Sequence, residues 1–112
     1  MSDYGDDEYS DNDESYYYDY PIIYDNYDKL MKLTKHDKTD DKLRDIVIGL
    51  IKASTIVKKK EVGFNYDYNI APRTEWLKIA QEFNSNVCGS DYRILIDESC
   101  IICYVVNEDL IN

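Results

Sequence analysis

The first 28 residues restrict what this chain of 112 residues can fold into. They contain ten aspartates and glutamates, eight tyrosines and no lysine or arginine. Ten like charges repel one another, and only Ile22 and Ile23 are aliphatic, so apolar burial cannot offset about 1–2 kcal/mol of backbone entropy per residue. We therefore predict a disordered, acidic, tyrosine-rich leader over residues 1–28 and one small domain over residues 29–112.

The leader also carries the net charge of the whole chain, which is −10. Its carboxylates would be repelled by phosphates, so we expect no direct binding to nucleic acid. Two interpretations stay open: the tyrosines and acids adhere to a basic protein surface, or the segment is a solubilising tail without a partner. Ser10 and Ser15 lie among acids, and we consider them possible phosphorylation sites that would add further charge.

Two segments of the domain have the apolar spacing of helices. In residues 42–60 the apolar positions lie 3, 4, 7 and 8 residues after the first, which forms one stripe. These positions are Leu43, Ile46, Val47, Leu50 and Ile51. A second helix is predicted over residues 74–86, where Trp76, Ile79 and Phe83 share one face. We interpret residues 61–73 between them, with Gly63 and Pro72, as a linker, and the polar residues 29–41 as a segment with at most a short turn.

The end of the chain changes to the pattern of strands. Residues 92–96 and 100–106 predict two strands joined by a short turn, and the second strand is almost wholly apolar. The predicted fold class is α+β, with a disordered acidic leader, two principal helices and a C-terminal strand pair. An apolar strand usually has both faces covered, whereas a helix layer covers only one. We therefore predict a large protein partner that covers the remaining apolar surface.

No catalytic or metal site is predicted. Three cysteines are an odd number and favour a reducing compartment over a disulfide framework. Cys100 and Cys103 form a CxxC pattern, but residues three apart on a strand point to opposite faces and cannot hold one ion. His36 is the sole histidine, and no local signature pairs it with a nucleophilic cysteine. We predict no cofactor, no metal and no enzymatic activity.

Three stretches resemble a known family. Residues 51–60 (IKASTIVKKK), 74–83 (TEWLKIAQEF) and 92–111 (YRILIDESCIICYVVNEDLI) are similar to the omega-like small common subunit of multisubunit DNA-directed RNA polymerases, especially to members from viruses or cytoplasmic elements. The sequence departs from the family pattern at Arg44, which is displaced by one position, and in the last stretch, where only Arg93 remains of the family's arginines.

The resemblance implies a non-catalytic α+β subunit that assists assembly and stability of the largest polymerase subunit in transcription. It also implies a partner-binding surface on the two helices, made of Leu43, Ile46, Val47, Leu50, Ile51, Trp76, Ile79 and Phe83. The alternative is a viral adaptor or inhibitor protein that binds a host factor and is not part of a polymerase. Lysine outnumbers arginine by ten to three, which fits the low-GC genomes of large DNA viruses and of cytoplasmic elements alike.

The expected location is intracellular, in the cytoplasm or virion if the protein is viral and otherwise in the nucleus. Two features of the sequence support this expectation. The chain has no run of about 18 apolar residues that could span a membrane. Its N-terminus is acidic, whereas a secretory signal begins with basic residues.

Overall fold

The computed structural model describes residues 20–112. Its elements follow in the order β1 (Ile22–Tyr24), α1 (Tyr27–Thr34), α2 (Lys42–Val57), β2 (Glu61–Asn65), α3 (Arg73–Asn86), β3 (Tyr92–Ile96), β4 (Cys100–Val105) and the short 3-10 helix η3 (Glu108–Leu110). The predicted α+β class is confirmed, including the two long helices and the C-terminal strand pair.

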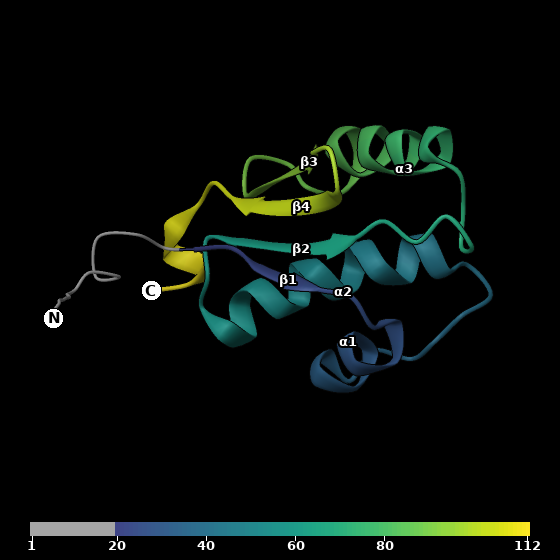
Figure 1. Ribbon diagram of the computed structural model, residues 1–112. Coiled ribbons are helices and arrows are strands. Elements are labelled where there is room, and N and C mark those ends of the chain that lie inside the picture. Colours follow the sequence, from purple (N-terminus) through teal and green to yellow (C-terminus); the bar gives the residue numbers. More distant parts are fainter. Residues whose placement is uncertain (1–19) are drawn as a thin grey trace, which may run out of the picture.

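The strands form one sheet in the order β1-β2-β4-β3, in which β1 and β2 are parallel and the other neighbours are antiparallel. Helices α1 and α2 lie beside the β1–β2 half of the sheet, and α3 lies beside β3 (Figure 1). The parallel pair is possible because α1 and α2 together form the crossover between β1 and β2, which a short turn could not provide.

One face of the sheet packs on the helices and forms the core. Residues directly opposite one another in register point to the same face, so the pairing identifies the members of this face. They are Ile22, Tyr24, Val62, Phe64, Tyr92, Ile94, Ile96, Ile101, Cys103 and Val105. The Phe64 ring stacks on Trp76 of α3 with centroids 6.4 Å apart. The Nε1 of Trp76 donates a hydrogen bond to the carbonyl oxygen of Ala71 at 3.0 Å, so the buried indole has no unsatisfied donor.

Strand β2 corrects the prediction of a linker over residues 61–73. Val62 and Phe64 are 0% and 1% exposed, and both belong to the core. Val62 and Phe64 do alternate with Glu61, Gly63 and Asn65, but the alternation is short, and Gly63 and Pro72 favour the interpretation as a linker. The pairing partners of β2, which are β1 and β4, come from the two ends of the domain.

The domain also begins earlier than predicted. Ile22–Tyr24 pair with Val62–Phe64, and α1 then starts at Tyr27, so residues 20–28 belong to the domain and not to a disordered leader. Ile22 and Ile23 are ordered because they pair with strand β2. This strand lies about forty positions away in the sequence, so the local sequence gives no sign of the pairing. Residues 1–19, with Ser10 and Ser15, lie outside the described residues, and so does the prediction of disorder for them.

Helix α1 replaces the predicted short turn, and it packs closely on α2 at Gly49. A Cβ built on Gly49 would lie 2.8 Å from Cε of Met31 and 3.1 Å from Cγ of Leu30. Both α1 side chains are buried, at 2% and 0% exposure. The glycine therefore lowers intrinsic helix propensity but allows α1 to lie directly against α2.

The buried stripe of α2 gives a first prediction, which concerns folding. Replacing both Ile46 and Leu50 with aspartate should abolish cooperative folding, because each side chain is 0% exposed and a buried carboxylate without a partner costs several kcal/mol. Far-UV circular dichroism and thermal melting measure this. The matched double variant Leu33→Asp and Ile56→Asp, at positions 37% and 49% exposed, should stay folded. A cooperative transition in the first variant would contradict the assignment of this stripe to the core.

Candidate functional site

The side chains predicted to bind a partner lie in the core of the domain. Ile46, Val47, Leu50 and Trp76 are 0% exposed, Phe83 is 1% and Ile79 is 7% exposed. Leu43 and Ile51 are partly buried against the same cluster. These helices meet the sheet and each other, so the folded domain does not present the stripe to a partner. The surface that a partner could contact has to be found elsewhere.

The second face of the sheet carries an apolar row that spans all four strands. Ile23, Gly63, Ile102 and Leu95 lie directly opposite one another in register on β1, β2, β4 and β3. None of the four belongs to the core cluster formed with the helices. Ile23 and Leu95, at the two ends of the row, are 38% and 46% exposed, whereas Ile102 between them is 8% exposed. We call this row the open-face strip.

Gly63 makes the strip continuous. A Cβ built on Gly63 would lie 2.9 Å from Cδ1 of Ile23 and 3.2 Å from Cγ1 of Ile102. The two isoleucines therefore occupy, from either side, the space that a side chain at this position would need. In the sequence, only the alternation within each short strand could have indicated this row, and in β2 the position that belongs to the row is a glycine without an apolar side chain.

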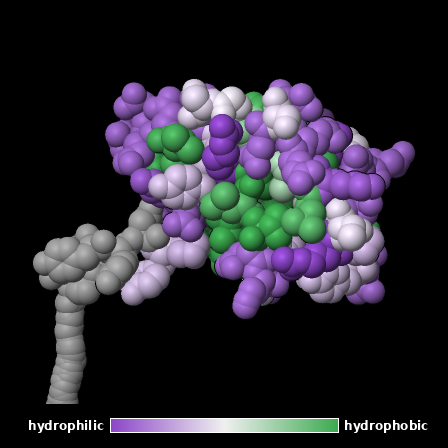
Figure 2. Space-filling model, turned by 90° about the horizontal axis from the view of Figure 1, so that it is seen from above, coloured by the Kyte–Doolittle hydropathy of each residue, from purple (hydrophilic) through white to green (hydrophobic). Residues whose placement is uncertain are grey.

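Polar residues border the open-face strip. On one side Glu61, Tyr104 and Arg93 form the neighbouring row, and Lys60 places its Nζ 5.3 Å from the centroid of the Tyr104 ring. On the other side Asn65 pairs with Cys100. Viewed from the side on which β3 and α3 lie in Figure 1, the surface shows apolar side chains gathered in one area with hydrophilic residues around it (Figure 2).

A second notable feature is the buried carboxylate of Asp45, which is 1% exposed. It accepts hydrogen bonds from the Tyr27 hydroxyl at 2.7 Å and from the backbone nitrogen and hydroxyl of Thr39 at 2.7 and 2.9 Å. His36 Nε2 lies 3.1 Å from Oδ1 of the same carboxylate. Asp45 thus ties α1, the loop after it and α2 together.

The titration of this cluster follows from these contacts. Burial alone would raise the pKa of Asp45, but the hydrogen bonds from Thr39, Tyr27 and His36 outweigh it and hold the pKa below its usual value. The pKa of Tyr27 is strongly raised, first by burial and then by the adjacent carboxylate. At neutral pH the cluster therefore contains an ionised Asp45 and a protonated Tyr27.

The same contacts indicate a structural role for His36. Lys52 Nζ lies 3.2 Å from Nδ1 of His36. An ammonium group only donates, so Nδ1 accepts and Nε2 donates its proton to Asp45. Within residues 20–112, the hydroxyls bonded to Asp45 are those of Tyr27 and Thr39, and both donate their protons to it. This arrangement orients a loop and supplies no activated nucleophile.

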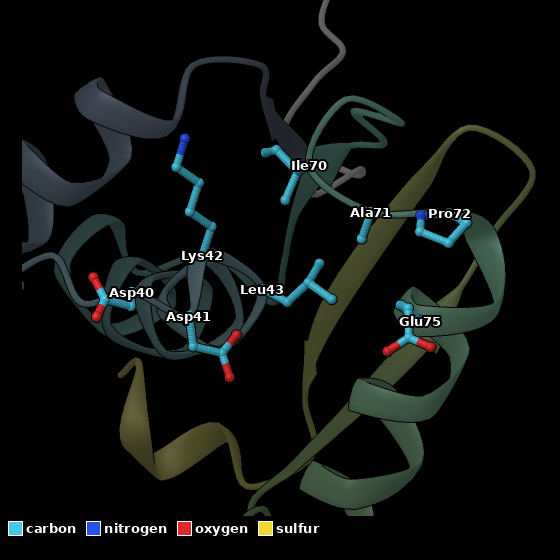
Figure 3. A pocket seen from close by; sticks show the side chains of 8 residues that line it. All are labelled: Asp40, Asp41, Lys42, Leu43, Ile70, Ala71, Pro72 and Glu75. Carbon is cyan, nitrogen blue, oxygen red and sulfur yellow. The ribbon is translucent and has the colours of Figure 1, made fainter.

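A cavity of about 540 Å³ lies between the first turn of α2 and the start of α3. It is lined by Asp40, Asp41, Lys42, Leu43, Ile70, Ala71, Pro72 and Glu75. Figure 3 shows Leu43 pointing toward Ala71 and Pro72, whereas Asp40 and Lys42 point away from the space between them. Few polar groups converge on a ligand position, which is unlike a small-molecule site.

The three cysteines are buried and free. Cys103 pairs with Val62 on the helix-covered face, whereas Cys100 pairs with Asn65 on the other face, as predicted for residues three apart on a strand. Among residues 20–112, no group of three or more histidine, cysteine, aspartate or glutamate side chains is arranged to hold a metal ion.

No family model, no curated protein and no solved structure matches this chain. Within the part of the chain that the structure describes, no helix is long and apolar enough to cross a membrane.

The Asp45 cluster gives a second prediction. Asp45→Asn should lower the free energy of unfolding at pH 7 by about 2–4 kcal/mol, because it leaves buried donors without a charged acceptor. The difference in unfolding free energy between the variant and the wild type should shrink below about pH 4. The folded-state pKa of Asp45 lies under its unfolded value of about 3.9. The wild type therefore loses the stability that the ionised carboxylate contributes as the pH falls through the folded pKa. Denaturant unfolding at pH 7 and pH 3 measures both. The exposed neighbour Asp37 provides the control Asp37→Asn, which should change little, and an equal deficit at both pH values would contradict the assignment.

The cysteines give a third prediction. At pH 8 none of the three thiols should react quickly with a disulfide reagent, because Cys88, Cys100 and Cys103 are at most 5% exposed and burial raises the pKa of Cys103 to about 12. All three should react in guanidinium chloride. The variant Ser90→Cys, at an exposed turn position near Cys88, should add one fast thiol. A fast thiol in the wild type would show that a cysteine is more accessible than its burial here indicates.

Proposed function

We propose that this chain is a non-catalytic, protein-binding subunit that attaches to a larger protein partner through the open-face strip. One observation carries the proposal: an apolar row extends across all four strands outside the core, with half-exposed aliphatic side chains at both ends. Exposed apolar side chains joined by an apolar row and bordered by polar residues are typical of protein interfaces. On this proposal, the surplus apolar surface expected from the sequence is the open-face strip of the sheet.

Charge indicates which partner the strip fits. Residues 61–112, which supply three of the four strands, contain nine acids and three bases. A second copy of this chain would bring the same negative charge to the interface, and the acidic residues 1–19 would be repelled as well. The immediate border of the strip is mixed in charge, with Glu61 near Arg93 and Lys60. The partner surface should therefore be apolar at its centre, with lysine or arginine farther out, opposite the acidic residues of this part of the domain.

The polymerase resemblance supplies a candidate for this partner. The third resembling stretch, residues 92–111, contains Leu95 and Ile102 of the strip. On this proposal the chain assists assembly and stability of the largest RNA polymerase subunit, and the contact is made by the sheet instead of the helix stripe. An adaptor or inhibitor that binds a host factor through the same strip is the alternative that the experiment must separate.

The fourth prediction uses variants of the full chain to test two claims: that the open-face strip is the interface, and that the partner is the largest RNA polymerase subunit. The probe is the largest RNA polymerase subunit encoded by the same genome, and binding is measured by calorimetry or co-expression and purification. Leu95→Asp and, separately, Ile23→Asp should weaken binding at least about 100-fold, because each places a carboxylate without a counterion in an apolar contact. Leu77→Asp, at a position 39% exposed on α3, is the matched control and should bind as the wild type does.

The outcomes are distinct. Binding that persists in both strip variants would show that the strip is not the interface. If the wild type does not bind the subunit, the polymerase assignment is wrong. Binding to a host factor that is lost only in the strip variants would then support the alternative. Melting temperatures of all three variants are compared first, so that loss of binding is not confused with loss of folding.

A further inference from the structure

The domain has a basic side that the proposed function does not use. Residues 29–60, which contain most of α1 and all of α2, include ten bases and only four acids. Seven lysines in and around these helices are solvent-exposed, and six of them precede the last turn of α2. These six are Lys29, Lys32, Lys35, Lys38, Lys42 and Lys52, and we call them the lysine face.

The helix itself aligns part of this face. Lys29, Lys32 and Lys35 are spaced three residues apart, so they follow one side of α1 and its C-cap. Within residues 20–112 no carboxylate forms an ion pair with any of these three. Their mutual repulsion is uncompensated by the described surface, which favours an acidic occupant.

The chain carries an acidic segment next to this face. Residues 1–19 contain eight acids, five tyrosines and no base. They lead directly into β1, and α1 begins three residues after β1 ends. Nineteen residues can extend up to roughly 60 Å, which is ample to reach α1. A tether of this kind gives an effective concentration on the order of millimolar, so weak charge contacts are sufficient.

The described residues already show the contact chemistry that such a segment would use. The Tyr27 ring lies under two lysines, with the Nζ of Lys38 5.8 Å and that of Lys42 5.5 Å from its centroid. Lys38 also pairs with Asp28. A tyrosine beside an aspartate, contacted by lysines, is the pattern that residues 1–19 repeat in sequence.

We propose that the lysine face of α1 and α2 is the docking surface for the chain's own residues 1–19. Carboxylates of the segment pair with the lysines, and its tyrosines lie on the lysine side chains. The segment is held away from the acidic half of the molecule, so the open-face strip stays free for a partner. This inference does not depend on the identity of that partner, and it can fail while the proposed function stands.

The experiment uses the full chain with a nitroxide label on Ser10→Cys, which is selective because the native cysteines are buried. At 10 mM salt the label should remove at least about half of the amide signal intensity across α1 and around Lys52. At 1 M salt the effect should disappear, because the Debye length falls from about 30 Å to about 3 Å.

Two charge variants of equal net change test the surface. Lys29→Glu with Lys32→Glu should abolish the intensity loss on α1 at low salt. Lys58→Glu with Lys78→Glu, at exposed positions outside the lysine face, should leave it in place.

Three results would overturn the proposal. The first is no loss on α1 in the labelled wild type, and the second is a loss confined to β3 and β4, which would place the segment on the open-face strip. The third is a loss that grows with protein concentration, which would show that the lysine face takes the acidic segment of another copy. Unchanged binding of the larger partner in the Lys29→Glu, Lys32→Glu variant would leave the proposed function intact in every case.

Discussion

The structure depends on strand β2, which pairs on both of its edges. Val62 and Phe64 extend into the core under α2 and α3, while Gly63 admits Ile23 and Ile102 on the other face. Without β2 the strand pair β3–β4 would be an isolated hairpin, which is marginal in water, and β1 would have no neighbour. This five-residue strand thus contributes to the sheet surface on which the helices pack, and it also makes the open-face strip continuous.

A buried polar cluster provides the second constraint. Asp45 accepts hydrogen bonds from α1 and from the loop after it, and it fixes their position on α2. Such a network makes a core rigid only when every polar group in it has a hydrogen-bond partner. Here the two hydroxyls, the backbone nitrogen and the imidazole all donate hydrogen bonds to the carboxylate. The contact also holds α1, and with it the lysines of its exposed side, in one orientation.

The molecule separates its surfaces by charge. The half built from α1 and α2 is basic, and the half built from α3, β3 and β4 is acidic and carries Leu95 and Ile102 of the open-face strip. An acidic segment is attracted to the first half and repelled by the second. Two proposed contacts, one within the chain and one with a partner, can therefore coexist without competing for the same residues.

The sequence by itself determined the elements whose periodicity is local: the stripe of α2, the amphipathic face of α3, the β3–β4 hairpin and the opposite orientation of Cys100 and Cys103. Tertiary structure alone decided what covers each apolar face. The sequence pattern of the α2 stripe is the same whether a partner or the domain's own sheet buries it. In this structure β2 and β4 bury it. Ile22–Tyr24 became ordered only because Val62–Phe64, far along the chain, offered backbone hydrogen bonds. Periodicity is set by neighbours in sequence, whereas strand pairing depends on segments that meet only after the chain has folded.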